Sequence, residues 1–169
     1  VLDFGLTMIA GYLPQDFEQR ALERARADLA AFAAEKAPKD VAVETHLANG
    51  LPAFNIVGLP EKAVQESRDR VRSALVNAGF DFPARRITVN LAPADLPKQG
   101  SRFDLAIAIG VLLASGQLPH DAADNYELIG ELSLAGIIRP VTGILPMALA
   151  TRDRGARLLL PRDNDQEAA

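Results

Sequence analysis

Apolar and polar residues alternate along several short segments of the chain, which predicts β-strands joined by turns. In residues 41–47 the alternation places valine, threonine and leucine side chains on one face and Glu44 and His46 on the other. The pair Asn49-Gly50 is typical of a tight turn. We therefore expect residues 41–47 and 53–57 to form a β-hairpin. Further strands are predicted at 2–9, 86–91, 126–132, 137–141 and 157–161.

Apolar residues recur at helical spacing in the segments between these strands. The segment that starts at Phe103 has almost no polar face, as expected of a helix buried in a core. Gly79 and Gly155 follow two of the helical segments and suit helix ends. Helices are predicted at 15–36, 61–78, 103–115 and 144–154. The order of elements predicts an α/β fold, with helices packed against a mixed β-sheet. Its expected core includes Val71, Leu75, Ile87, Val89, Leu105, Ile109 and Leu112.

A rigid polar loop is expected between the strand at 86–91 and the helix at 103–115. Pro93 and Pro97 fix φ and disfavour the helical conformation at the residues before them. Functional residues of α/β domains are often placed on such loops. Residues 93–102 are therefore the first place to look for a site.

Composition limits the classes of protein to which the chain can belong. Its 169 residues suit one domain, or one domain with an appendage, and it contains no cysteine. Disulfides, thiolate catalysis and cysteine-type zinc sites are thereby excluded. No apolar run approaches the roughly 20 residues of a membrane-spanning helix, and we expect no secretory leader in residues 1–10. A cytoplasmic location is expected.

Basic residues gather in the middle of a chain whose net charge is -4. Residues 41–119 hold eight Lys and Arg against seven acids, and six of the eight are arginine, which binds phosphate or carboxylate with two parallel hydrogen bonds. The candidate contacts with DNA or a protein partner are Arg68, Arg70, Arg72, Arg85, Arg86, Lys98 and Arg102. In the alternative interpretation, Arg68 and Arg72 only hold the domain together, by pairing with Glu66, Asp69 or Asp104.

Several kinds of chemistry lack the residues that they need. None of the four lysines lies in the G-x-x-x-x-G-K-[ST] pattern of a nucleotide phosphate loop. The two histidines, His46 and His120, have no second metal ligand at helical spacing. No cofactor and no metal are therefore expected in this chain. As an acid–base pair, Asp95, Asp104, Glu127 and Glu131 are weak candidates, since Asp95 suits a loop cap and Asp104 a helix start.

Ser101 and Lys98 lie close together in the loop and raise the possibility of a serine–lysine peptidase. A lysine acts as a general base only when burial lowers its pKa. Between Pro97 and Gln99, Lys98 is expected to be exposed to solvent. A peptidase is therefore kept as the alternative function.

Several longer runs of sequence resemble a known family. These runs are Asn55–Pro60, Glu127–Leu134, Val43–Pro52, Arg68–Leu75, Ile87–Lys98 and Arg102–Ala108. They resemble the N-terminal domain of the ComM/YifB proteins, which are magnesium-chelatase-like AAA+ ATPases of bacteria. The resemblance covers residues 41–164 and implies a fold like that of ribosomal protein S5 domain 2 and the proteolytic domain of Lon.

The same resemblance implies a role for the chain. Full-length members are expected to carry a hexameric ATPase after this domain and to act as DNA branch-migration helicases in natural transformation. The chain would then be a non-catalytic accessory domain whose partners are its own ATPase domain, neighbouring subunits and DNA. ATP and Mg are implied only for the ATPase domain.

Comparison with Lon-type peptidases places Arg102 where their nucleophilic serine stands and Leu145 where their lysine stands. Both positions have lost the peptidase chemistry. Residues 1–40 do not match the family's usual start and are treated as an atypical segment. The family-like domain is expected at 41–164, followed by a polar, frayed tail at 165–169.

Overall fold

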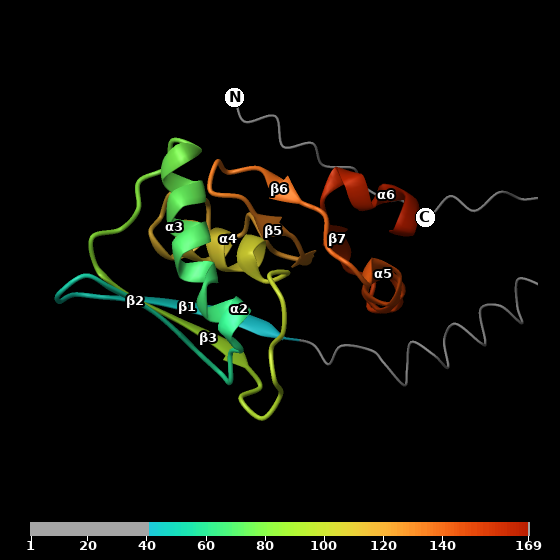
Figure 1. Ribbon diagram of the computed structural model, residues 1–169, viewed down its shortest axis with the longest axis horizontal. Coiled ribbons are helices and arrows are strands. Elements are labelled where there is room, and N and C mark those ends of the chain that lie inside the picture. The colour runs from blue at the N-terminus through green and yellow to red at the C-terminus, as the bar shows by residue number, and fades with distance from the viewer. Residues whose placement is uncertain (1–40, 169) are drawn as a thin grey trace, which may run out of the picture.

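The structure, a computed structural model, describes residues 41–168 (Figure 1). The strand predicted at 2–9 and the helix predicted at 15–36 lie outside the described residues. The elements are β1 (Ala42–Ala48), β2 (Ala53–Val57), α2 (Lys62–Gln65), α3 (Ser67–Asn77), β3 (Arg86–Ala92), α4 (Asp104–Ala114), β4 (Tyr126–Leu128), β5 (Glu131–Leu132), β6 (Ile138–Arg139), α5 (Ile144–Asp153), β7 (Arg157–Leu159), the 3-10 helix η1 (Arg162–Asn164) and α6 (Asp165–Ala168). The predicted α/β class with a mixed sheet is confirmed.

The first three strands form a sheet in the order β1-β3-β2. β1 is antiparallel to β3, and β2 is parallel to it. The predicted hairpin is therefore wrong, because β3 lies between β1 and β2. Ile87, Val89 and Leu91 of β3 are fully buried, and a central position lets this apolar strand form backbone hydrogen bonds along both edges.

The remaining strands form two further sheets, β4-β7 and β5-β6, so the predicted strand at 126–132 is interrupted. The break lies at Ile129 and Gly130. Ile129 still donates its N–H to Leu159 of β7, whereas Gly130 bonds to the start of α4 and the residues just before it. Gly130 donates its N–H to the carbonyl of Arg102 and accepts from the N–H of Leu105. A Cβ at Gly130 would lie 2.8 Å from Ile138. Glycine therefore permits this close approach.

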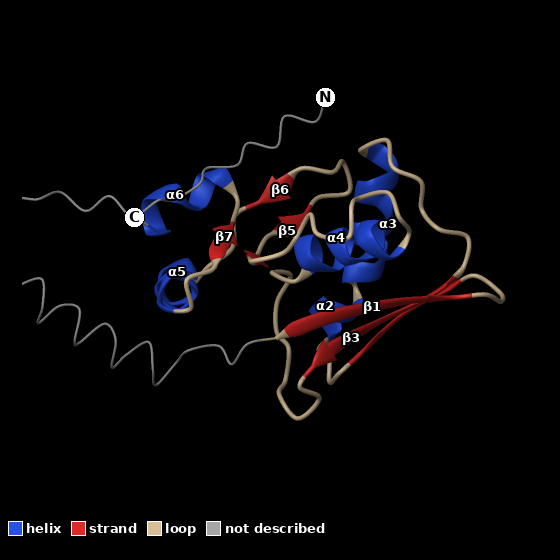
Figure 2. Cartoon of the chain, turned by 180° about the vertical axis from the view of Figure 1, so that it is seen from behind, coloured by secondary structure: helices blue, strands red, loops and turns tan. Residues whose placement is uncertain are grey.

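The helices α3 and α4 cover one face of the three-stranded sheet (Figures 1 and 2). Six of the seven predicted core residues are buried: Val71, Leu75, Ile87, Val89, Leu105 and Leu112. All of these except Leu105 belong to the core cluster that joins the helices to the sheet. The prediction for Ile109 is wrong, since it is only half-buried, and Ile107 is fully buried instead. The buried stripe of α4 runs through residues 104, 105, 107, 108, 111 and 112, and at 3.6 residues per turn Ile109 lies beside it.

The three helices predicted within residues 41–168 agree with the structure, with one interruption. The segment 61–78 is divided at Glu66 into α2 and α3, whereas α4 and α5 begin and end within one residue of their predicted bounds. No helix within residues 41–168 has both the length and the apolar character needed to cross a membrane.

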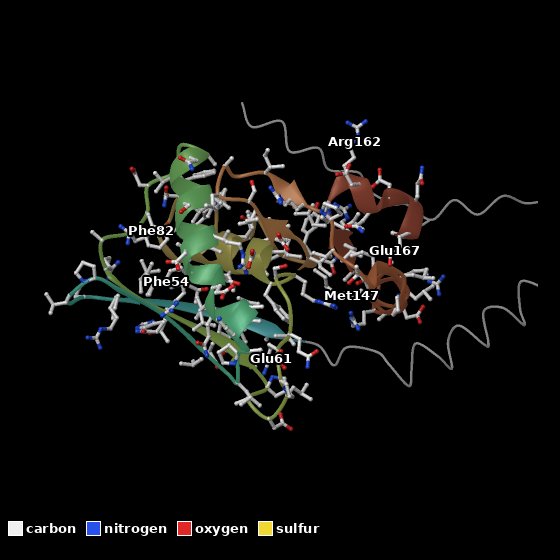
Figure 3. The ribbon with its side chains drawn as sticks, in the orientation of Figure 1. Phe54, Glu61, Phe82, Met147, Arg162 and Glu167 are labelled. Carbon is white, nitrogen blue, oxygen red and sulfur yellow. The ribbon has the colours of Figure 1, made fainter. Side chains whose placement is uncertain are left out.

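The C-terminal residues up to 168 are folded, which corrects the expected frayed tail. Asn164 is buried and exchanges two hydrogen bonds with the backbone of Val141, at 3.0 and 2.8 Å. Glu167 accepts from the N–H groups of Gly143 and Ile144 at 3.1 and 3.0 Å. This carboxylate caps the N-terminus of α5, where backbone donors otherwise lack partners. Figure 3 shows Glu167 beside α5.

Candidate functional site

The seven candidate basic residues do not form one patch. Arg70 lies against the start of α4, where its Nε donates to Asp104 at 2.6 Å and its Nη2 donates to the other carboxylate oxygen at 3.1 Å. The hydrogen bond to Asp104 raises the pKa of Arg70 against the opposing effect of burial, and the charges of Asp104, Glu131 and Glu66 add to the rise. Arg70 is therefore held in a structural ion pair.

Asp104 is fully buried and joins three elements. Besides Arg70 of α3, its carboxylate accepts from the hydroxyl of Ser67 and from the N–H of Leu132 in β5. The alternative interpretation, that an arginine pairs with Asp104 to hold the domain together, thus applies to Arg70. It does not apply to Arg68 or Arg72. Asp104 does open α4, as expected of a helix-start acid.

Lys98 is almost completely buried, with 1% of its surface exposed, which corrects the expectation of a solvent-exposed lysine. Its ammonium donates to the carbonyl of Pro93 across the loop. Its backbone bonds to Leu59 and Glu61, so the loop is held against the segment that leads into α2. Lys98 cannot be a surface contact to DNA.

Ser101 does not donate to Lys98. Its hydroxyl donates to the carboxylate of Glu131, 30 residues further along the chain. The two members of the considered dyad are thus engaged by different partners. Near this loop, the half-buried Arg102 makes one side-chain hydrogen bond within residues 41–168, from Nη1 to the sulfur of Met147 at 3.8 Å.

Four of the arginines are exposed, and none of them takes part in an ion pair within residues 41–168. The guanidinium of Arg72 lies 5.3 Å from the ring centroid of Phe82. Phe82 in turn packs 5.6 Å from Phe54 of β2, at the end of the sheet where Arg86 begins β3 (Figure 3). Arg85 donates to the side chain of Asn49 at 3.0 Å.

The fourth exposed arginine, Arg68, lies one helical turn before Arg72 on α3. It bonds to the carbonyl of Gln65 at 3.0 Å, near the start of α3. The ring contacts therefore place Arg72 near the end of the sheet that holds Arg85 and Arg86. Arg68 lies one turn further along α3 from this end, and the other three candidates, Arg70, Lys98 and Arg102, are engaged in contacts of their own.

The four candidate carboxylates differ in their surroundings, and they do not share a common set of partners. Glu127 accepts from Arg154 at 2.6 and 2.7 Å and from the hydroxyl of Thr151 at 2.6 Å. Burial acts to raise the pKa of Glu127, but the hydrogen bonds from Arg154 and Thr151 and the charge of Arg154 together lower it below its ordinary value. Asp95 is exposed. Residues 41–168 hold no group of three potential metal ligands.

A groove of about 950 Å³ lies beside β1 and was not predicted from the sequence. It is lined by the start of β1, the loop at 96–103, one side of α4, all of β4, and residues of α5. The only sequence signal for the groove is the wide apolar surface of α4. Apolar residues extend around this helix beyond the face that packs against the core. Ile109 faces this groove, which is why it is only half-buried.

Comparison with known proteins places the chain in a family. The family model described as "Subunit ChlI of Mg-chelatase" matches residues 43–164. The chain belongs to this family. Within the magnesium-chelatase family it is 54% identical over 129 residues to "Competence protein ComM" of Haemophilus influenzae, covering 76% of this chain and 25% of the relative. It is 50% identical over 127 residues to "Uncharacterized protein YifB" of Escherichia coli, covering 75% and 25%.

These relatives confirm the resemblance to the ComM/YifB proteins. "Lon protease 2" of Bacillus subtilis is also similar, at 31% identity over 124 residues, or 69% of this chain and 22% of the relative. This similarity agrees with the α/β fold expected from the Lon resemblance. The chain spans about a quarter of the length of the relatives that it matches.

Proposed function

We propose that residues 41–168 form a non-catalytic accessory domain of a longer magnesium-chelatase-like ATPase, and that its end at Arg72, Arg85 and Arg86 contacts DNA. Family membership and the much greater length of the relatives support the first part. In the full-length protein we expect a hexameric ring that acts as a branch-migration helicase, with ATP and Mg bound outside this chain.

The observation that carries the DNA contact is the lack of acidic partners at this end. The exposed side chains of Arg72, Arg85 and Arg86 take part in no ion pair within residues 41–168, although the chain as a whole is acidic. Charges left unpaired can displace counterions from phosphates, which favours binding at low salt. Base stacking contributes little, since Phe54 and Phe82 pack against each other.

The alternative function, a serine–lysine peptidase, is disfavoured by the geometry of the loop. A nucleophile and its base must lie within hydrogen-bond reach. Ser101 instead donates to Glu131, and Lys98 donates to Pro93.

DNA binding by the 169-residue chain tests the proposal. Fluorescence anisotropy with single-stranded and duplex DNA at about 50 and 200 mM salt should show weak binding that falls steeply with salt. Arg85→Ala/Arg86→Ala should weaken binding to all sequences and reduce the salt slope by about two. The matched control, Arg139→Ala/Arg162→Ala, removes two exposed charges elsewhere on the domain and should leave binding unchanged. Undetectable binding by the folded wild type at low salt would rule out the DNA contact and leave assembly of the ring.

A second assay addresses the peptidase. Wild type and Ser101→Ala are incubated with an unfolded protein substrate, and we expect no cleavage by either. Cleavage that depends on Ser101 would refute the accessory role.

A further inference from the structure

The groove beside β1 lies between the edges of two strands. Within residues 41–168, β1 pairs only with β3, and β4 pairs only with β7. The groove is lined by Val41, by the first two residues of β1, Ala42 and Val43, and by all three residues of β4. Successive side chains of a strand point to opposite faces, so three consecutive residues border one groove only where the strand's edge faces it. Backbone groups of both edges are therefore presented to the groove.

The walls between these edges are mostly apolar. Phe103, Ile109 and Leu113 line the groove from α4 and the turn before it, and Met147 and Ala150 line it from α5. All five side chains are only partly buried. Met147 is labelled in Figure 3, between α5 and the rest of the domain. An extended segment laid along the groove would cover these side chains and pair with a strand edge.

One cation lies in this apolar setting. Arg102 lines the groove, is half-buried, and within residues 41–168 makes one side-chain hydrogen bond, to the weakly accepting sulfur of Met147. Arg154 also lines the groove, but it is paired with Glu127. A guanidinium binds a carboxylate through two parallel hydrogen bonds. The occupant that complements the groove therefore carries a carboxylate at the position of Arg102.

We propose that this groove binds an extended peptide of a partner protein, apolar at alternate positions, whose C-terminal carboxylate pairs with Arg102. Addition of a strand to an exposed sheet edge is an established mode of peptide recognition, in which backbone hydrogen bonds supply affinity and side-chain pockets supply specificity. The bound peptide pairs with the edge of β1 that faces the groove and lies alongside β4. It therefore occupies the space between the β1-β3-β2 sheet and the β4-β7 sheet. This site is separate from the exposed arginines proposed to contact DNA.

The test uses the 169-residue chain and the acetylated pentapeptide Val-Thr-Val-Thr-Val with a free C-terminus. Two matched probes are its C-terminal amide and a version N-methylated at alternate residues, which cannot donate those backbone hydrogen bonds. Isothermal titration should show the free acid binding about tenfold tighter than the amide, because the amide lacks the charge that pairs with the guanidinium. The N-methylated peptide should bind at least tenfold more weakly than the free acid.

Two variants locate the peptide in the groove. Arg102→Gln should remove the preference for acid over amide, whereas the control Arg139→Gln, at an exposed position of β6, should retain it. Ile109→Gln should weaken all binding, and its urea midpoint shows that the fold is kept. No binding to wild type would overturn the proposal. Equal affinity for acid and amide, or for methylated and unmethylated backbones, would overturn it as well. DNA binding by Arg102→Gln should equal that of wild type, so the two proposals fail independently.

Discussion

Replacement of Asp104 is expected to destabilise the domain more than loss of an exposed carboxylate. In Asp104→Ala the guanidinium of Arg70, whose side chain is 20% exposed, loses its buried counter-ion. The N–H of Leu132 and the hydroxyl of Ser67 lose their acceptor in the same variant. Breaking a buried ion pair from one side costs about 3–5 kcal/mol, and the partial exposure of Arg70 favours the lower end of that range.

The expected loss of about 3 kcal/mol is a large share of the 5–15 kcal/mol stability that is roughly typical of a domain. Urea unfolding at pH 7, followed by far-UV circular dichroism, should show a lower midpoint with an unchanged slope. Asp121→Ala, which removes an exposed aspartate, is the matched control and should change stability by less than about 0.5 kcal/mol.

A double variant separates the unpaired charge from the lost contacts. Arg70→Met/Asp104→Leu removes both charges and should be more stable than Asp104→Ala, since no uncompensated guanidinium remains. A loss below about 1 kcal/mol in Asp104→Ala would show that the ion pair is not a main support of the domain.

Three further predictions concern single side chains. Thr45→Val should stabilise the domain by about 1 kcal/mol, because the buried hydroxyl of Thr45 has no hydrogen-bond partner within residues 41–168; a lower melting temperature would contradict this. Because the folded-state pKa of Glu127 is lowered, its contribution to stability is present above the unfolded pKa of about 4.3 and is lost as pH falls through the folded value. Glu127→Gln should therefore lose less stability than wild type between about pH 5 and 3, and parallel profiles would refute the role of its bond to Arg154. Asn164→Ala should cost about 1–3 kcal/mol and speed amide exchange at the start of α5, whereas unchanged exchange would show that the C-terminal segment does not support this helix.

The sequence by itself determined the features that depend on neighbouring residues. The bounds of α4 and α5 follow from apolar residues at helical spacing, and the two faces of β1 follow from alternation. Long runs of family-like sequence were sufficient to indicate the α/β class and the ComM/YifB relationship, and the family match confirms them.

Only the tertiary structure decided the strand order and the fate of each basic residue. The Asn49-Gly50 pair predicts a turn, but β3, some 40 residues further along the chain, displaces the pairing that the turn suggests. Arg70 meets Asp104 across 34 residues, while Lys98 is buried by its loop, although both resemble ordinary surface residues in the sequence. The groove exists only where β1, α4, β4 and α5 come together. Local patterns constrain each element, but contacts between distant elements set which edges stay unpaired and which charges remain exposed.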